Sequence, residues 1–280
     1  MTNPIAAAEQ AIILCNRGYH SDAIKLILSD PIWGPVMTES RKRDAYQSND
    51  GVLLTLGEAL RCAGVIPAAL KLLKHSERYA MSIGDSTLAS DSLHQLGVLH
   101  KENFQDFEEA RKCYTAALEI RRDLGDRDRI ASSLHELGIL EQFSERFTDA
   151  MRLYQESLPM SVESLDLYQV ANTKAQIGRV QHQEQRFAQA AASYAVAYKM
   201  MTLMQSPNLP VLERWVSDLR RVMGDDDLQA AWENGKDDPD LRILQRIRVC
   251  LVCKCPVWPV SLGNRSRYGT WCQSPQEHGA

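Results

Sequence analysis

The residues with the strongest potential for chemistry lie near the C-terminus. Cys250, Cys253 and Cys255 fall close together, Cys272 follows, and His278 lies beyond it. Thiolate sulfur and imidazole nitrogen are the usual ligands of structural zinc, which takes four of them in a tetrahedron. Cys250, Cys253, Cys272 and His278 would supply one such set, but the second Cys-x2-Cys pair that makes this pattern specific is missing. We therefore expect no cofactor and keep zinc in this tail as the alternative to incidental cysteines.

Histidines recur at similar places along the chain, at His94, His135 and His182. Nucleophilic catalysis needs a nucleophile held beside a base, and no such pairing is visible at short range. The phosphate-binding Gly-x4-Gly-Lys-Ser/Thr motif is absent, and HELGI fails the HExxH zinc pattern because Ile139 occupies the second histidine position. We interpret the histidines as polar residues on one face of stacked helices and expect a protein that is not an enzyme.

Charge is unevenly distributed along the 280 residues, which carry 32 Lys and Arg against 36 Asp and Glu. From Leu241 onward there are six basic residues and one acid, a net charge of +5, so the first 240 residues hold 26 bases and 35 acids, a net charge of −9. An acidic body repels phosphate. Nucleic acid is therefore not an expected partner, except through the basic tail.

The sequence also predicts a cellular location. No apolar run approaches the roughly 20 residues that a membrane helix needs, and MTNPIAAAEQAIILCNRG lacks a basic region before its apolar residues. Cys15, Cys62 and Cys113 lie alone inside apolar helical patterns, so we interpret them as small core residues rather than disulfide partners. We expect a cytoplasmic protein without membrane contact.

An internal repeat organises the chain, because DSLHQLGVL at 91–99 nearly recurs as SSLHELGIL at 132–140. A Leu-Gly or Ile-Gly pair recurs with a period of about 40 residues, and an alanine follows each glycine at a nearly constant distance. The glycines are Gly57, Gly97, Gly138 and Gly178, and the alanines are Ala69, Ala110, Ala150 and Ala190. A large residue stands four positions after each alanine, at Leu73, Tyr114, Tyr154 and Tyr194. Several columns in one register indicate a repeat architecture.

Each repeat predicts two helices joined by a short polar turn such as FSERF. Apolar residues follow the helical period on both sides of this turn, and we expect Gly138 to face Ala150 where the helices approach. Gly-Asp pairs at 84–85 and 125–126 mark the boundaries between repeats, because glycine suits a left-handed helix end and aspartate an N-cap. Asp166 continues this column, with Leu165 in place of glycine.

The series Leu93, Leu96-Gly97, Ala110 and Tyr114 resembles the tetratricopeptide repeat pattern. The resemblance covers about residues 48–206, and LEIRRDLGDRDRIASSLHELGIL is similar to 40-residue bacterial arrays found beside signalling NTPase and caspase-like modules. Two features depart from the family. The period exceeds the usual ~34 residues, and the frequent tryptophan is replaced by leucine or, in the last repeat, by Lys174.

We predict an all-α fold, a right-handed α-solenoid of five stacked helical hairpins with a C-terminal capping helix near 210–223. A solenoid needs such a cap over the apolar face of its last repeat. The expected domains are a degenerate first hairpin and loop at 1–47, the repeat array at 48–206, capping helices at 207–236 and the basic cysteine-containing tail at 237–280.

The first helix of each hairpin is expected to line a concave groove that binds a partner. Its groove residues are predicted from their positions beside the Leu-Gly column: His94, Gln95, Val98, Lys101, His135, Glu136, Ile139, Gln142, Gln176 and Arg179. This set lacks the Lys and Asn with which some family members bind a chaperone's C-terminal carboxylate, so chaperone tails are not expected. The favoured function is a scaffold or adaptor for a partner protein or peptide. The alternative is a regulatory sensor subunit that controls a separate effector protease or NTPase.

Overall fold

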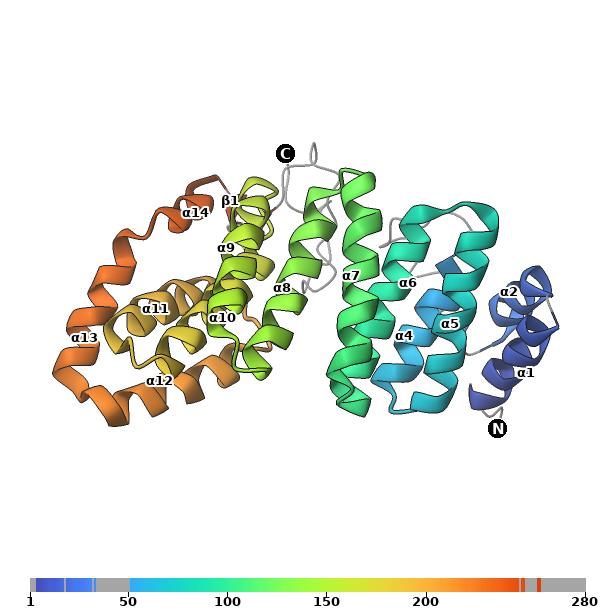
Figure 1. Ribbon diagram of the computed structural model, residues 1–280, viewed down its shortest axis with the longest axis horizontal. Helices are drawn as coiled ribbons and strands as arrows, with labels where there is room; N and C mark the ends of the chain where they lie inside the picture. Colours follow the sequence, from blue (N-terminus) through green and yellow to red (C-terminus); the bar gives the residue numbers. More distant parts are fainter. Residues whose placement is uncertain are drawn as a thin grey trace. The chain divides into compact units, whose positions relative to one another are not determined.

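The computed structural model describes residues 4–17, 19–31, 33, 51–246, 248–249 and 256–257. Nearly all of them are helical (Figure 1). The α-helices are α1 (Pro4–Asn16), α2 (His20–Ser29), α4 (Val52–Cys62), α5 (Ile66–Ile83), α6 (Ser86–Leu99), α7 (Phe107–Asp123), α8 (Arg127–Phe143), α9 (Phe147–Glu163), α10 (Leu167–Gln183), α11 (Phe187–Leu203), α12 (Leu209–Met223), α13 (Asp225–Asn234) and α14 (Ile243–Arg246). A π-helix, η2 (His100–Phe104), extends α6, and two 3-10 helices follow α13, η3 (Gly235–Asp237) and η4 (Pro239–Arg242). Two short strands, β1 (Arg248–Val249) and β2 (Pro256–Val257), pair antiparallel.

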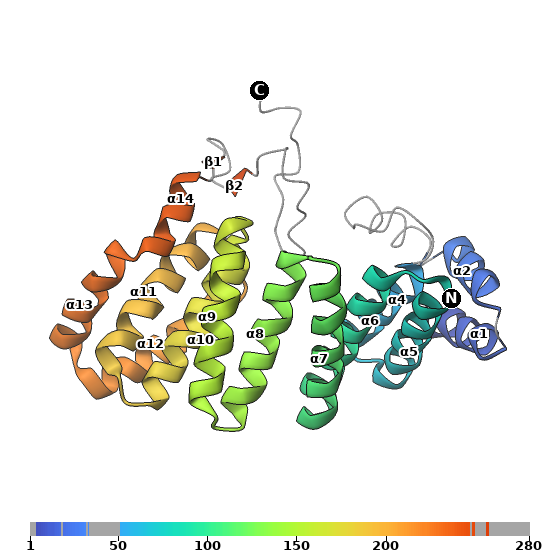
Figure 2. The same cartoon turned by 45° about the horizontal axis from the view of Figure 1, so that its top comes forward.

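The chain forms two compact units, residues 1–129 and 130–280. In the first, the hairpins α1–α2, α4–α5 and α6–α7 follow one another. In the second, α9, α10, α11, α12 and α13 continue the pattern from α8, which begins just before the boundary. Figures 1 and 2 show consecutive helices side by side within each unit. The predicted all-α class of stacked hairpins is confirmed, residues 51–206 contain no strand, and α12 is the predicted capping helix.

The 40-residue period follows from long helices and short turns. The helices α8, α9, α10 and α11 each have 17 residues. Three residues separate α8 from α9, and three more separate α9 from α10. Two such helices with their two turns fill one period of 40 residues.

The interval from Gly97 to Gly138 is one residue longer than the other two, and η2 is the structural cause. The extra residue lies between Gly97 and Tyr114, which are 17 apart, whereas Gly138 and Tyr154 are 16 apart. A π-helical turn holds one more residue than an α-helical turn. The wider helical turn at His100–Phe104 accommodates the extra residue before α7 begins, so Tyr114 still contacts Gly97.

Residues in the left-handed conformation and aspartate N-caps mark the boundaries between repeats. Gly84 closes α5 with φ of 73°, and Leu165, which replaces glycine at the equivalent place, has φ of 61°. The side chains of Asp85, Asp126 and Asp166 each accept a hydrogen bond from the backbone N–H three residues later. The predicted N-caps are therefore confirmed. At the end of α9, Leu165 takes the left-handed conformation that glycine has elsewhere.

The glycines at 97, 138 and 178 make room for an aromatic ring, a contact that the sequence analysis did not predict. A Cβ atom placed on Gly138 would lie 2.5 Å from the ring of Tyr154, and one on Gly97 would lie 2.6 Å from Tyr114. Both rings are fully buried. The glycine and tyrosine columns are thus the two sides of one contact, which holds the helices of each hairpin together.

The cysteines of the described residues are reduced, and they differ in exposure. Cys15 and Cys113 are buried, and burial raises the pKa of each thiol to about 11. Cys62 is exposed, so its interpretation as a core residue is wrong; it lies at the end of α4, where the helix emerges from the stack. None of the described helices combines the length and apolar character needed to cross a membrane.

The end of the second unit is closed by α12, α13 and η4. Leu212 and Leu219 of α12 and Leu228 of α13 are buried in the core that α11 completes. Lys174 of α10 lies 2.8 Å from Asp238 and 2.7 Å from Asp240. The lysine that replaces leucine in the last repeat is therefore a specific ionic contact with the capping segment.

Candidate partner-binding face

Half of the predicted groove residues lie in the interior. His94, Gln95, Val98, His135 and Gln142 are all buried. The expectation that their side chains are open is wrong, because a helix in the middle of a stack is covered on more than one side. Eleven of the 14 residues of α6 are buried, polar ones included.

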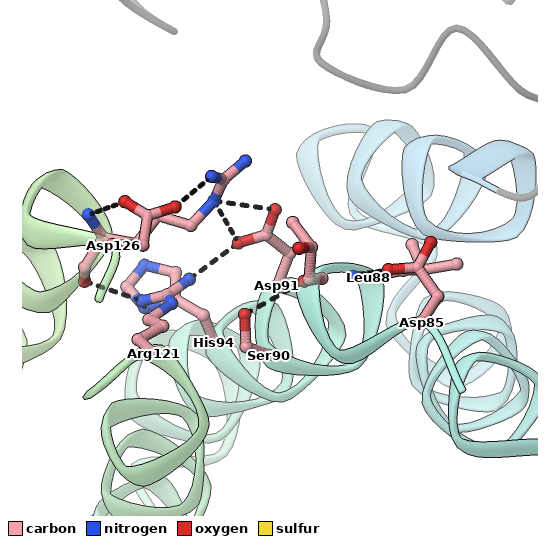
Figure 3. Close-up of polar contacts among 9 residues, drawn as sticks. Asp85, Leu88, Ser90, Asp91, His94, Arg121 and Asp126 are labelled. Atoms are coloured by element: carbon pink, nitrogen blue, oxygen red, sulfur yellow. Dashed lines mark hydrogen bonds and ion pairs between the residues drawn. The ribbon is translucent and has the colours of Figure 1, made fainter. Parts of the chain in front are cut away.

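A buried ionic network in the first unit explains the position of His94 (Figure 3). The Arg121 guanidinium lies 2.8 Å from Asp91 Oδ1, and the two side chains are 1% and 0% exposed. Arg121 Nη1 also lies 3.2 Å from His94 Nδ1, and because arginine has no acceptor, this nitrogen of His94 accepts. Arg129 binds the same carboxylate at 3.1 Å and also pairs with Asp126.

This network joins α6 to the end of α7 and the start of α8. The Arg121 guanidinium further donates to the backbone oxygen of Arg129, so one side chain holds the turn between two repeats. The network is closed to solvent at Asp91, Arg121 and His94. Within the first unit, it holds the end of α7 and residues 126–129 against α6, and it offers no surface to a partner.

The other buried candidates are also used within the protein. His135 Nδ1 lies 2.9 Å from Thr173 Oγ1, which links α8 to α10. The amide of Gln142 donates to Gln183 at 2.6 Å and accepts from the Tyr154 hydroxyl at 3.1 Å. In the first unit, the Lys101 side chain is 11% exposed and lies beside Glu102. These contacts position the helices rather than leaving groups free for a ligand.

The remaining predicted residues, Glu136, Ile139, Gln176 and Arg179, are half-buried and belong to the second unit. Arg179 is the centre of this group. Its guanidinium carbon lies 5.0 Å from the ring centroid of Trp215 on α12 and 6.0 Å from that of Phe143 at the end of α8. We call the surface formed by Phe143, Ile139, Gln176, Arg179 and Trp215 the Arg179 face.

The Arg179 face carries a positive charge without an acidic contact. Arg179 forms no hydrogen bond or ion pair with any residue in the described part of the chain, and its guanidinium contacts two aromatic rings. Beneath it, burial raises the pKa of the Tyr154 and Tyr194 hydroxyls, while the positive charge of Arg179 opposes this rise at both. The guanidinium therefore lies close enough to influence two buried tyrosines.

Two buried polar atoms next to Arg179 have no hydrogen-bond partner among the described residues. They are Gln176 Oε1 and Tyr194 Oη. The preceding repeat satisfies the equivalent hydroxyl, because Tyr154 donates to Gln142. Forty residues after Gln142 the chain has His182, whose ring instead packs on Phe187 at 5.7 Å. The last repeat thus leaves polar groups uncompensated where its predecessor does not.

Sequence reasoning identified Arg179 and Gln176 but missed Phe143, Trp215 and Tyr194. Phe143 could have been detected from the sequence, because it is a large apolar residue in the polar stretch FSERF at a helix end. In the structure it is 52% exposed. Tyr194 belongs to the column of large residues in the repeats, and its ring is buried. Nothing in the periodic pattern indicates that its hydroxyl lacks a partner.

The predicted zinc ligands Cys250, Cys253, Cys272 and His278 lie outside the described residues, so zinc in the tail stays a prediction. Within the described ranges no three His, Cys, Asp or Glu side chains come together as a metal site. The chemistry that the Arg179 face offers is non-covalent: one cation, two aromatic rings and an aliphatic side chain.

Comparison with known proteins agrees with this architecture. Residues 101–161 match the family model described as tetratricopeptide repeat. The crystal structure of BtubC (BKLC) from P. vanneervenii is similar with a TM-score of 0.56 and 16% identity, covering 86% of this chain and 90% of that one. A Signal Transduction ATPase with Numerous Domains with a tetratricopeptide repeat sensor, from Pyrococcus horikoshii, gives a TM-score of 0.49 and 17% identity, covering 87% of this chain and 41% of that one. No curated protein matches the sequence.

Proposed function

We propose that this chain, of which residues 101–161 match the tetratricopeptide repeat family model, is a scaffold that binds an extended peptide segment of a partner protein on the Arg179 face. The repeat fold suggests protein–protein interaction in general. The finer assignment rests on the surface of the second unit. The proposal places binding on this face and includes no catalytic activity.

The observation that carries the proposal is the pairing of an exposed aromatic ring with an unneutralised cation. Phe143 is 52% exposed beside Arg179, whereas the repeat tyrosines are completely buried. Aromatic residues and arginine are the side chains that most often dominate binding energy at protein interfaces.

A regulatory sensor would use the same face, because control of a separate effector protease or NTPase would begin with binding at the repeats. The effector, the cytoplasmic location and nucleic-acid contact through the basic tail stay predictions. The proposal is therefore limited to the binding step, which the side chains support.

We expect Phe143→Glu to weaken peptide binding by about 10-fold or more, because it removes a stacked ring and adds a charge that pairs with Arg179. The probe is a random 12-residue peptide library, acetylated and amidated at its ends, from which binders to the wild-type protein are isolated. Their affinities are then measured by fluorescence anisotropy.

Met81→Glu is the matched control, since Met81 is 64% exposed and belongs to the first unit. Its affinity should stay within about twofold of wild type, because surface substitutions away from a site are usually neutral. Equal binding by Phe143→Glu and wild type would contradict the proposal, as would a library from which the wild-type protein retains no peptide.

A further inference from the structure

A segment that follows α13 is held on the second unit by its side chains. Residues 235–244, which we call the strap, contain η3, η4 and the start of α14, and they lie against α11 (Figure 2). The backbone hydrogen bonds of the strap are local, because the N–H of Asp238 donates to Gly235 and that of Leu241 to Asp238. Among the described residues, none joins its backbone to that of α10 or α11. Side chains therefore decide what this part of the repeats recognises.

One lysine of the last repeat makes the ionic contact. The ammonium of Lys174 on α10 lies 2.8 Å from Asp238 Oδ2 and 2.7 Å from Asp240 Oδ2. Only 11% of the lysine side chain is exposed, against 22% for each aspartate. An ammonium has three N–H donors and no acceptor, so it satisfies two carboxylates at once. An occupant without an acid would leave this nearly buried cation uncompensated.

Lys174 stands in a column that is apolar in the earlier repeats. The equivalent residues are Leu53, Leu93 and Leu134, and Leu53 and Leu134 are completely buried. Leucine would serve here as well if the strap only had to be packed, because burying a lysine carries a desolvation cost. The lysine therefore favours recognition of acids over simple packing.

Two apolar side chains and a glycine complete the fit of the strap. Leu241 and Ile243 are 9% and 1% exposed, and they belong to the same core as α10 and α11. A Cβ atom on Gly235 would lie 2.5 Å from the backbone oxygen of Ala192, so the strap backbone approaches α11 directly. The occupant thus has acids at positions 238 and 240 and apolar residues at 241 and 243.

The repeats do not depend on the strap for their cap. Leu212 and Leu219 of α12 and Leu228 of α13 are buried in the core that follows α11, and all three precede the strap. Two of the strap's turns are 3-10, with poorer hydrogen-bond geometry than an α-helix. Segments held by few buried contacts open at a lower free energy than the core. We therefore expect the strap to leave while α10–α13 stay folded.

We propose that the strap occupies a second peptide-binding site, the strap site, and that a segment of a partner protein with the same pattern displaces it. The ligand has two acids two residues apart, with apolar residues one and three positions after the second acid. Lys174 binds the acids, and the surface under Leu241 and Ile243 binds the apolar residues. Lys174 and Arg179 are five positions apart on α10, about 140° around the helix, so this site is not the Arg179 face.

A partner protein is the expected source of this segment rather than a second copy of the chain. A strap tethered to its own repeats has a far higher effective concentration than the identical strap of another molecule. An identical segment therefore cannot displace it at ordinary protein concentrations, whereas a segment that fits more tightly can.

The test uses the full chain and a fluorescent peptide with the sequence of residues 235–246, blocked at both ends. The released variant carries Asp238→Asn, Asp240→Asn, Leu241→Asn and Ile243→Asn, which remove both contacts of the strap and keep Lys174. It should bind the peptide in fluorescence anisotropy. Wild-type protein should bind at least about 10-fold more weakly, because its own strap competes.

The acid dependence of binding separates recognition from packing. In the released variant, placing Asn at both acidic positions of the peptide should weaken binding by about 10-fold or more, as for a hydrogen-bonded ion pair. Adding Lys174→Leu should abolish this difference. Lys199→Leu is the matched control, because Lys199 is an exposed lysine on α11 and its loss should keep the preference for acids. Phe143→Glu should leave this binding unchanged.

Four results would overturn the strap site. A released variant that melts as wild type does but binds no peptide would make the strap a fixed part of the cap. Equal binding by wild type and released variant would mean that the strap does not occupy the site. Equal binding of acidic and amide peptides would mean that Lys174 does not select acids. In light scattering, a wild-type dimer that Lys174→Leu abolishes would assign the site to the strap of a second copy. If the released variant does not fold, the variant with Asp238→Asn and Asp240→Asn alone carries the same comparisons.

Discussion

Replacing Arg121 with methionine should destabilise the protein by about 3–5 kcal/mol, the usual cost of removing one partner from a buried ion pair. The substitution leaves the carboxylate of Asp91, which is 0% exposed, with Arg129 as its remaining cation. It also removes the hydrogen bonds to His94 and to the backbone of Arg129. Urea unfolding followed by circular dichroism gives the free energy of unfolding directly.

The double variant Asp91→Leu with Arg121→Met is the informative control. A buried pair replaced by apolar residues of similar size is often close to neutral, because neither charge is left without its partner. Much of the lost stability should therefore return, while Arg129 keeps its contact with Asp126. A loss below about 1 kcal/mol in the single variant would show that the network does not hold the repeats together.

Gly138→Leu should cost about 3 kcal/mol, at the upper end of overpacking effects, because there is no space for a side chain. A Cβ atom there would lie 2.5 Å from the ring of Tyr154, and that ring is fully buried and cannot move aside. The same unfolding measurement detects the change.

A double-mutant cycle with Tyr154→Ala identifies the cause. If the ring occupies the space, Gly138→Leu should cost clearly less when residue 154 is alanine, and the two substitutions should couple by about 0.5 kcal/mol or more. Leucine at 154 would be a poorer choice, because in the first repeat a Cβ atom on Gly57 would lie 2.8 Å from the side chain of Leu73. An unchanged cost in the Tyr154→Ala background would contradict the glycine–tyrosine contact.

The repeat pattern predicted the fold because the same local interactions are used several times. The Leu-Gly or Ile-Gly pair and the leucine or tyrosine that follows it recur at nearly constant spacing, so a helix, its turn and its partner helix follow from one another. The positions of Asp85 and Asp126 predicted two helix starts for the same local reason. The π-helix at 100–104 needed the structure, although the longer interval from Gly97 to Gly138 already marked its place.

Exposure could not be predicted with the same success, because it depends on neighbouring hairpins. His94 and His135 lie beside core positions on their own helices, yet adjacent helices cover both. The ionic contacts were missed for a related reason. Asp91 and Arg121 are 30 residues apart, and Lys174 and Asp238 are 64 apart, and no periodic signal connects them.

Site-specific photo-crosslinking tests the binding face most directly. The photoreactive residue p-benzoylphenylalanine is placed at position 143 or, as the control, at position 81, and each protein is irradiated with a library-selected peptide. Position 143 lies on the Arg179 face and position 81 in the other unit, and both native side chains are exposed. We predict crosslinking from position 143 alone, and it should disappear in Arg179→Glu. Crosslinking from position 81, or none from position 143 while the peptide is bound, would contradict the proposed face.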